Sequence, residues 1–361
     1  MEISTISLDT FLRDSKSSKG ISEAQKAAES LISTGALIIQ DSRISKESND
    51  KFLDLFEDYF NQDQDILKFD ERPEVGFQVG VTLENTEKPK CASDENCQNI
   101  ISLLEENERP IDLGNHGADP KCRFFHRMSE KTPYESNFPV LEAPNVIPSK
   151  FQNTWEDGVN EWGGSLKQAV EGVAQMVAVG LGLDENTFTD AGQYGSHLLA
   201  PTATDLVKYG KLNTIYAGFH TDLNFLTIHG QSRYPGLHIW ARNSGKKIQV
   251  KIPPGCLLVQ AGKQIEWITG GLIKAGYHEV VCTQATLDTI AKRKVEFPER
   301  PLIRISSTFF WHLSHDFRLT PIPDLKNEAE SRFGQQEDYG EMLVGDQVRR
   351  ELGLIALMKP S

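Results

Sequence analysis

Three side chains in the second half of the chain have the types and spacing of a metal site. His220 and Asp222 are separated by one residue, so on a strand both side chains point to the same face. His278 follows downstream, with several candidate strands between it and Asp222. Two imidazoles and one carboxylate leave about three positions open on an octahedral ion, which suits iron(II) holding a cosubstrate and O₂. Since zinc would prefer a four-coordinate site, the pattern predicts iron(II) bound by these three residues.

Arg304 and Ser306 form a second pair with the same one-residue spacing, and they would also share a face of a strand. A guanidinium matches the geometry of a carboxylate, and a hydroxyl adds one hydrogen bond. The pair could therefore hold the far carboxylate of 2-oxoglutarate while the keto-acid end of that molecule binds the metal. A structural ion pair is the alternative interpretation of Arg304.

Short strands are the elements that must carry these residues. From about Ser196 onward, short apolar runs follow one another, with turn residues such as Pro253-Pro254-Gly255 between them. About eight closely spaced short strands fit a double-sheet jelly roll better than a parallel α/β sheet. The expected strands are LNTIYAGFH, NFLTIHG, GLHIWAR, KIQVKI, CLLVQA, QIEWIT, GYHEVVCT and PLIRISSTFFWHL. We therefore expect a mainly β fold with flanking helices around a distorted double-stranded β-helix, the cupin-like jelly-roll core.

Helices are expected in the first half of the chain. Ser22 and Gln25 have the spacing of a capping box that opens a helix ending near Gly35. Apolar residues repeat at helical spacing over 52–60, and a third helix is expected over about 165–180. The segments GALIIQ and GFQVGV are the strand candidates of this half.

The chain is expected to divide into three regions. Residues 1–150 would form a helical or mixed cap packed on the core, 151–320 the jelly-roll core, and 321–361 a helical C-terminal tail. The stretch from Thr86 to Pro148 is polar and Pro-rich, which predicts surface loops and short helices. Its histidines, His116 and His126, are expected to be solvated.

The ordered motifs HTD, GYHEVV and RIS followed by FFWH resemble those of the 2-oxoglutarate/iron(II) dioxygenases. The segment between the two histidine motifs is similar to the branch that contains isopenicillin N synthase and plant flavonoid oxygenases. The resemblance implies iron at the mouth of a distorted jelly roll and an oxidoreductase that consumes 2-oxoglutarate and O₂. Succinate, CO₂ and a hydroxylated, desaturated or cyclised product would be formed.

The chain departs from that branch at one position. Branch members usually carry a Tyr that helps to hold 2-oxoglutarate, on a strand well before the first metal histidine. The corresponding stretch here is the run from His197 to Pro201, which has no Tyr. Tyr209 and Tyr216 are the candidates to compensate. Isopenicillin N synthase keeps the Arg-x-Ser pair without using 2-oxoglutarate, so the pair supports that cosubstrate without deciding it.

Residues that would contact the substrate are harder to recognise. Phe225, Trp240 and His312 are candidates because they lie on or beside the strands that carry the predicted site. Packing in the core is the competing interpretation for the two aromatic residues. Branch membership implies a small-molecule substrate, such as an amino-acid derivative or a secondary metabolite.

Composition limits the kinds of partner. The chain has 361 residues with 39% hydrophobic residues, enough for a sizeable core, and a formal net charge of −13. Such an acidic protein would be repelled by nucleic acid and by anionic membranes, so neither is expected as a partner. The five cysteines are odd in number and match no zinc pattern, and no apolar signal or membrane-spanning segment is evident. We expect a cytoplasmic monomer with reduced thiols.

Two other functions are compatible with the same sequence. An iron oxidase of the same fold could take electrons from its own substrate and need no 2-oxoglutarate. A non-catalytic jelly-roll module could bind a small ligand. The intact set of metal-ligand residue types argues against the second alternative, because a binding module has no need of an open-faced metal site.

Overall fold

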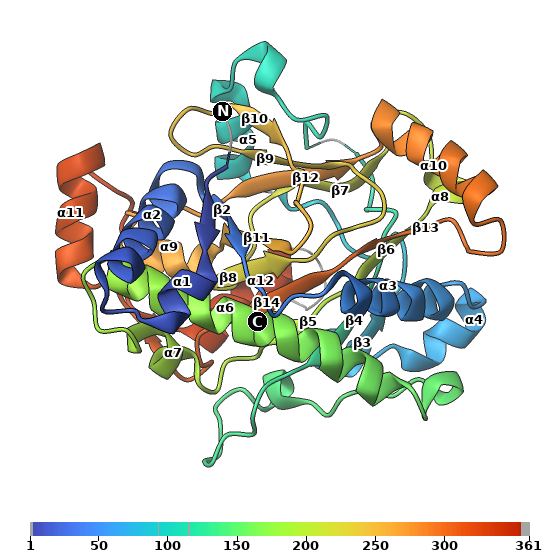
Figure 1. Cartoon of the computed structure of the whole chain (residues 1–361), viewed down its shortest axis with the longest axis horizontal. Coiled ribbons are helices and arrows are strands. Elements are labelled where there is room, and N and C mark those ends of the chain that lie inside the picture. The colour runs from blue at the N-terminus through green and yellow to red at the C-terminus, as the bar shows by residue number, and fades with distance from the viewer. Residues whose placement is uncertain (1–2, 93, 115, 355–361) are drawn as a thin grey trace.

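The computed structural model describes residues 3–92, 94–114 and 116–354. Part of the predicted C-terminal tail, residues 355–361, lies outside these ranges. Two β-sheets form the centre of the molecule, and most helices lie around the larger sheet (Figure 1). No helix within the described ranges combines the length and apolar character needed to cross a bilayer.

The larger sheet has the strand order β1-β2-β11-β8-β14-β5-β4-β6-β13, with β3 paired to β4. Its strands are β1 (Thr5–Ser7), β2 (Ala36–Gln40), β3 (Gly80–Thr82), β4 (Cys122–Arg127), β5 (Leu198–Leu199), β6 (Thr202–Asp205), β8 (Leu226–His229), β11 (Cys256–Ala261), β13 (Ile303–Ser306) and β14 (Thr308–Trp311). The pairing is antiparallel except between β1 and β2. Strands from the first 150 residues are therefore integral to this sheet.

The smaller sheet has the order β10-β9-β12-β7 and is antiparallel. It consists of β7 (Ile215–His220), β9 (Leu237–Trp240), β10 (Lys247–Gln249) and β12 (Tyr277–Val281). A separate ribbon pairs β15 (Arg318–Leu319) with β16 (Met342–Leu343). Residues of both sheets line one cavity, so the two sheets face each other as in a jelly roll.

Helices surround the two sheets. They are α1 (Leu8–Arg13), α2 (Ser18–Thr34), α3 (Lys46–Phe60), α4 (Gln64–Leu67), α5 (Glu95–Leu103), α6 (Trp155–Gly180), α7 (Thr187–Gly192), α8 (Leu206–Tyr209), α9 (Lys263–Ile268), α10 (Gln284–Glu296), α11 (Pro323–Phe333) and α12 (Val344–Leu354). Short 3₁₀ helices lie at Lys68–Asp70, Pro73–Val75, Lys90–Ala92, Glu106–Glu108, Pro139–Glu142 and Ser149–Phe151. The long helix α6 packs against α1, α2 and α3 and against strands β8 and β14 of the larger sheet, which buries its apolar residues in the main core.

Several helix boundaries differ from the expected ones. Helix α2 begins earlier than predicted, because the hydroxyl of Ser17, rather than that of Ser22, caps it by accepting a hydrogen bond from the Gly20 N–H. It ends as predicted at Gly35, whose positive φ of 74° terminates the helix. Helix α6 starts at Trp155 and not near Ser165, since Trp155, Val159 and Trp162 extend the buried face toward its N-terminus.

Two segments adopt a different structure from the predicted one. The run QIEWIT forms helix α9 and not a strand, because Ile265 and Ile268, three residues apart, both pack into the core. The predicted loop region contains β4, which lies inside the larger sheet between β5 and β6. His126 is therefore buried on this strand and not solvated.

The cysteines also differ from the expectation of reduced thiols. Cys91 and Cys97 form a disulfide, whereas Cys122, Cys256 and Cys282 are free. The short helix Lys90–Ala92 and helix α5 bring the two bonded residues together in a small core with Phe219 and Trp240. This local turn could not be recognised from the spacing alone.

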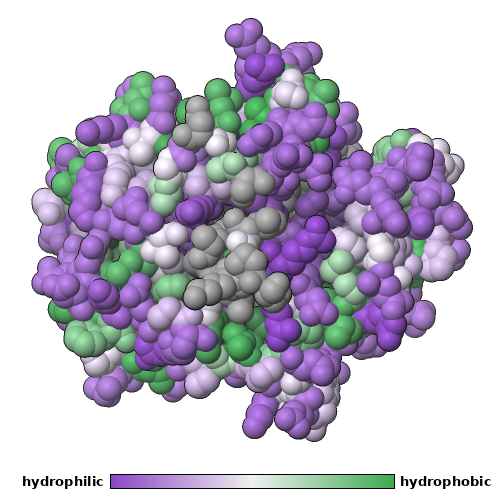
Figure 2. All heavy atoms as spheres, turned by 180° about the vertical axis from the view of Figure 1, so that it is seen from behind, coloured by the Kyte–Doolittle hydropathy of each residue, from purple (hydrophilic) through white to green (hydrophobic). Residues whose placement is uncertain are grey.

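Polar residues predominate on the outer surface, in contrast to the apolar core. On the face shown in Figure 2, hydrophilic residues predominate and apolar ones occur in small separate groups. This distribution agrees with the acidic composition of the chain.

Candidate metal and cosubstrate site

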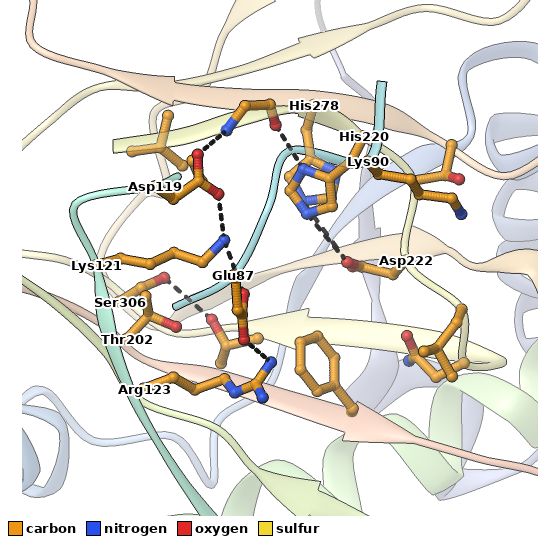
Figure 3. Close-up of a pocket in the computed structure, with 18 of the residues that line it drawn as sticks. Glu87, Lys90, Asp119, Lys121, Arg123, Thr202, His220, Asp222, His278 and Ser306 are labelled. Atoms are coloured by element: carbon orange, nitrogen blue, oxygen red, sulfur yellow. Dashed lines mark hydrogen bonds and ion pairs between the residues drawn. The ribbon is translucent and has the colours of Figure 1, made fainter. Parts of the chain in front are cut away.

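His220, Asp222 and His278 meet at one point between the two sheets (Figure 3). His220 ends β7 and pairs in register with His278 on the neighbouring strand β12, so the two imidazoles lie side by side. Their Nε2 atoms lie 3.6 and 3.8 Å from Oδ1 of Asp222. One possible ligand atom from each residue falls within 4.8 Å of the others. The three atoms are thus close enough to bind one ion.

Hydrogen bonds orient each of the three side chains. The Nδ1 atoms of His220 and His278 face the carbonyl oxygens of Gly218 and Gly276, at 2.6 and 3.4 Å. Donation to these carbonyls places the proton on Nδ1 and leaves the lone pair of each Nε2 directed at the site. The hydroxyl of Thr227 donates to Oδ2 of Asp222 at 2.6 Å, which leaves Oδ1 on the side of the histidines.

The protonation states suit a divalent cation. Burial, together with the neighbouring His278, lowers the pKa of His220 to about 4, so this imidazole is neutral at physiological pH. Burial acts to raise the pKa of Asp222, but attraction to the two histidines and the Thr227 hydrogen bond outweigh it, so the pKa is lowered. Neutral imidazole and ionised carboxylate are the forms that bind metal. The donor set therefore fits iron(II).

Arg304 lies in the same cavity, on β13, with only 6% of its surface exposed. Its Nε has no hydrogen-bond partner, and its guanidinium forms no ion pair with any residue that the structure describes. Burial lowers its pKa to about 10, so the group is still charged at neutral pH. A buried cation without a counterion is costly, and an anionic ligand would remove that cost. Arg304 is thus suited to bind a carboxylate.

Ser306 and two further polar side chains lie in the same cavity as Arg304. The hydroxyl of Ser306 lies 3.0 Å from that of Thr308, which in turn lies 3.1 Å from Nδ1 of His229. Arg304 and Ser306 are paired across the sheet with Thr204 and Thr202. All of these residues line the cavity that contains the three candidate ligands.

Residues 201–313 match the sequence profile of the 2OG-Fe(II) oxygenase superfamily. This segment includes all three candidate metal ligands as well as Arg304 and Ser306. Over this segment the chain is similar to the 2OG-Fe(II) oxygenase superfamily. The resemblance predicted from the sequence motifs is confirmed.

The curated relatives of this chain are distant. It is 24% identical to a flavonol synthase/flavanone 3-hydroxylase of Petunia hybrida over 178 residues, which are 49% of this chain and 46% of that protein. It is 28% identical to gibberellin 3-beta-dioxygenase 1 of Arabidopsis thaliana over 244 residues, which are 64% and 61% of the two chains. The alignments thus span less than two thirds of each relative's length.

Solved structures confirm the fold of the chain. A 2OG-Fe(II) oxygenase family protein from Caulobacter crescentus is 18% identical, with a TM-score of 0.71 and coverage of 97% of this chain and 98% of that one. A full-length Neurospora crassa protein, crystallised in complex with alpha-KG, is also 18% identical, with a TM-score of 0.72 and coverage of 97% and 96%. These likenesses show the predicted fold class, a distorted jelly roll with flanking helices.

The structure places one of the three predicted substrate contacts in the cavity and the other two outside it. His312 lines the cavity. Phe225 is buried away from it, packed against Phe188 and Trp311 in the main core. Trp240 packs edge-on against Phe219 and donates from its indole nitrogen to the Glu108 carbonyl. Neither aromatic residue lines the cavity. Phe225 lies just before β8, and on β9 it is Leu237 that lines the cavity, whereas Trp240 points to the other face of that strand.

The structure also distinguishes between the two candidates for the missing tyrosine. Tyr216 is buried on β7 and lines the cavity together with Arg304. Tyr209 lies outside it, with its hydroxyl 3.4 Å from the side-chain nitrogen of Asn85. Tyr216 is therefore the better placed of the two residues.

A wall of charged side chains was missed by the sequence analysis. Lys121 contacts Glu87 at 3.1 Å and Asp119 at 2.6 Å, and Arg123 pairs with the same Glu87 (Figure 3). The Arg123 guanidinium also lies 3.8 Å from the centroid of the Phe125 ring. Lys121, Arg123 and Phe125 are spaced two apart, but the run does not alternate regularly between polar and apolar residues, so it carried no clear period-two signal for β4.

A histidine outside the cavity is part of the same region. His116, expected to be solvated, is half-buried and lies between Asp112 and Asp119, at 2.8 and 2.9 Å. Burial acts to lower its pKa, but the hydrogen bonds to both carboxylates win and raise the pKa to about 9. The ring is therefore protonated at neutral pH.

Proposed function

We propose that this protein is an iron(II)-dependent oxygenase that couples oxidation of a small molecule to conversion of 2-oxoglutarate into succinate and CO₂. The observation that supports it most is the combination, in one cavity, of the converging ligand set with a buried Arg304 that lacks a counterion among the described residues. One oxygen atom of O₂ would enter succinate and the other would oxidise the substrate. Iron(II), when bound, would supply the binding and reduction of O₂.

In this proposal the chain's own residues bind and orient the reactants. His220, Asp222 and His278 would hold the metal. Arg304 and Ser306 would bind the far carboxylate of 2-oxoglutarate, and Tyr216 would line the same end of the cosubstrate site. Because the Arg304 side chain is buried and β13 is paired with β6, the guanidinium would hold the cosubstrate in one orientation.

The substrate would lie beside the charged wall. The cavity is about 190 Å³, and its lining includes Lys121, Arg123 and Glu87 as well as the rings of Phe125 and Phe310. We infer a small polar substrate with an apolar part, compatible with an amino-acid derivative or a secondary metabolite. His312 remains a proposed substrate contact.

Helix α12 helps to close the cavity. Val348 and Leu352 line it, and Glu351 of the same helix forms an ion pair with Lys90 at 2.5 Å. In the proposed reaction these side chains would keep water from the reacting atoms.

Succinate formation from 2-oxoglutarate, measured with iron(II), O₂ and a panel of small polar molecules, tests this function. We expect His220→Ala, Asp222→Ala and His278→Ala each to abolish it. If all three variants still formed succinate at the wild-type rate, the assignment would be wrong. Substrate-dependent O₂ uptake without succinate would favour the 2-oxoglutarate-independent oxidase. Absence of metal binding after anaerobic purification would favour the non-catalytic module.

A further inference from the structure

Strand β7, which carries His220, is the edge strand of the smaller sheet, where β12 is its neighbour. The side of β7 away from β12 must therefore find other partners for its backbone N–H groups. Two carboxylates from the loop that precedes β4 provide them. Asp119 Oδ1 accepts from the Gly218 N–H at 3.2 Å, and Asp112 Oδ2 accepts from the Phe219 N–H at 2.8 Å.

The imidazole of His116 joins these two carboxylates. Its Nδ1 lies 2.8 Å from Asp112 Oδ1 and its Nε2 lies 2.9 Å from Asp119 Oδ1. Asp112 Oδ1 also accepts from the Gly114 N–H at 2.7 Å, which closes the turn of the loop. Asp112 and Asp119 are both buried. The three side chains thus form one connected unit, which we call the 112–119 clamp.

The clamp is also tied to the strand of the second histidine. Glu279 follows His278 directly on β12, and its carboxylate is buried. It accepts hydrogen bonds from the Ile111 N–H at 3.1 Å and the Asp112 N–H at 3.3 Å. The loop is therefore attached to both strands that carry the candidate histidines.

A single peptide group connects the clamp with His220. The N–H of Phe219 and the carbonyl of Gly218 belong to the same peptide plane. That N–H donates to Asp112, and that carbonyl accepts from His220 Nδ1 at 2.6 Å. The Asp112 carboxylate, which binds the N–H of this peptide, thus fixes the direction of its carbonyl. That carbonyl in turn orients the His220 imidazole.

Gly218 shows how closely the clamp approaches the strand. A Cβ atom at this position would lie 2.4 Å from Asp112 Oδ2 and 2.7 Å from His116 Cε1. Only glycine leaves room for the carboxylate and the ring against the backbone. The contact is therefore specific to this peptide and not a loose covering of the strand.

We propose that Asp112, His116 and Asp119 are positioning residues that hold the Gly218–Phe219 peptide and thereby orient His220 for metal binding. The inference rests on the proposed function, because it needs His220 to be a metal ligand. Loss of hydrogen-bonded partners behind a metal ligand typically weakens metal affinity by about 10–100-fold. Asp112→Asn should weaken metal binding in this way. In the wild type the hydrogen-bond partners of Asp112 use both carboxylate oxygens, whereas the asparagine side chain has only one acceptor oxygen.

Binding of Co(II) to the metal-free protein, followed by visible absorption, tests the proposal without relying on catalysis. Asp316→Asn is the matched control, since Asp316 also accepts hydrogen bonds across a loop, from Ser136 and the Asn137 N–H, but lies outside the cavity. We expect Asp112→Asn to raise the Co(II) Kd about 10-fold or more, with a changed visible band. The control variant should leave the Co(II) Kd and the visible band unchanged. Denaturant unfolding of the two variants separates weaker metal binding from a general loss of stability.

Other outcomes of this experiment have definite meanings. If Asp112→Asn binds Co(II) with wild-type affinity and spectrum, the clamp only stabilises the fold and the positioning role is wrong. His116→Gln, which breaks the bridge but keeps both carboxylates, should shift the Kd in the same direction if Asp112→Asn does not fold; an unchanged Kd there overturns the role as well. If His278→Ala binds Co(II) as tightly as the wild type, the proposed function itself fails, whatever Asp112→Asn does.

Discussion

At the scale of single residues, Arg304 has the most unusual environment near the candidate site. It carries a positive charge into a cavity where none of the described carboxylates forms an ion pair with it. A buried charge without a counterion costs free energy of folding, which an apolar side chain of similar volume does not. Arg304→Met should therefore leave the ligand-free protein at least as stable as the wild type.

The same Arg304→Met substitution should weaken the binding of 2-oxoglutarate. Removal of one partner of a buried charge pair costs at least about 2 kcal/mol, which is about 30-fold in Kd. Calorimetric titration of the Mn(II)-loaded protein measures the affinity, and denaturant unfolding measures the stability. A large loss of stability with unchanged affinity would indicate the structural ion-pair role considered for Arg304.

His116 should make stability depend on pH. Its pKa is raised from about 6.5 to about 9, so its contribution is fully present below pH 6.5 and is lost as the pH rises through 9. We expect the free energy of unfolding to fall between these values, by on the order of 2 kcal/mol once solvent screening of this half-buried ring is allowed for. In His116→Gln this slope should be reduced. Parallel pH profiles for the two proteins, measured by denaturant unfolding, would contradict the assignment.

Spacing along the chain explains which site residues could be predicted. His220 with Asp222, and Arg304 with Ser306, are local pairs whose common face follows from strand geometry alone. Lys121, Arg123 and Glu87 could not be found in this way, because their meeting depends on how β4 and the loop before it are placed. Trp240 was wrongly expected in the cavity, since a period-two pattern does not reveal which face of a strand meets the cavity. Phe225 lies just before β8, where strand geometry gives no direction for its side chain.

At the scale of elements, the contact between α2 and α6 depends on glycine. A Cβ on Gly180 would lie 2.1 Å from the carbonyl oxygen of Ala24, which is backbone and cannot turn aside. A Cβ on Gly164, in the same helix, would meet nothing within 4 Å. Gly180→Ala should therefore destabilise the protein by about 1–3 kcal/mol. Gly164→Ala should stabilise it by up to about 1 kcal/mol through helix propensity.

Denaturant unfolding of the two alanine variants measures both effects. Opposite signs for the two changes are the expected result. Equal effects would mean that helix propensity, rather than the approach of α2 to α6, governs both positions.

Element types were predictable where the apolar period was long enough. The repeat over 52–60 correctly predicted a helix, and Gly35 marked a helix end. QIEWIT failed because six residues can satisfy a period of two and a helical spacing equally well. The stretch containing β4 was missed since its many polar neighbours concealed a short strand.

At the scale of the whole molecule, ligands that bind only the folded state should stabilise it. Mn(II) and 2-oxoglutarate under anaerobic conditions, at about 100 times their Kd values, should each add about 2.7 kcal/mol. We expect the Tm of the wild type to rise by several degrees in a thermal scan. His278→Ala should lose this rise. An equal rise in the variant would show that both ligands bind elsewhere.

The general architecture followed from the sequence better than its connections did. Many short strands late in the chain indicated a jelly roll, and the structure has one. The contribution of β1, β2 and β4 to the larger sheet was not foreseen, since pairing between distant segments leaves no local pattern. The proposed division into regions 1–150, 151–320 and 321–361 stays a prediction.

The position of β2 has a consequence for how the nascent chain folds on the ribosome. Residues 36–40 leave the ribosome early, but their partner β11 spans residues 256–261 and is made much later. Until then the apolar faces of α2 and α6 lack the sheet that covers them, and the growing polypeptide is exposed to aggregation. Synthesis of this protein should therefore depend on chaperones that hold α2 and α6 until the strand arrives that completes the sheet.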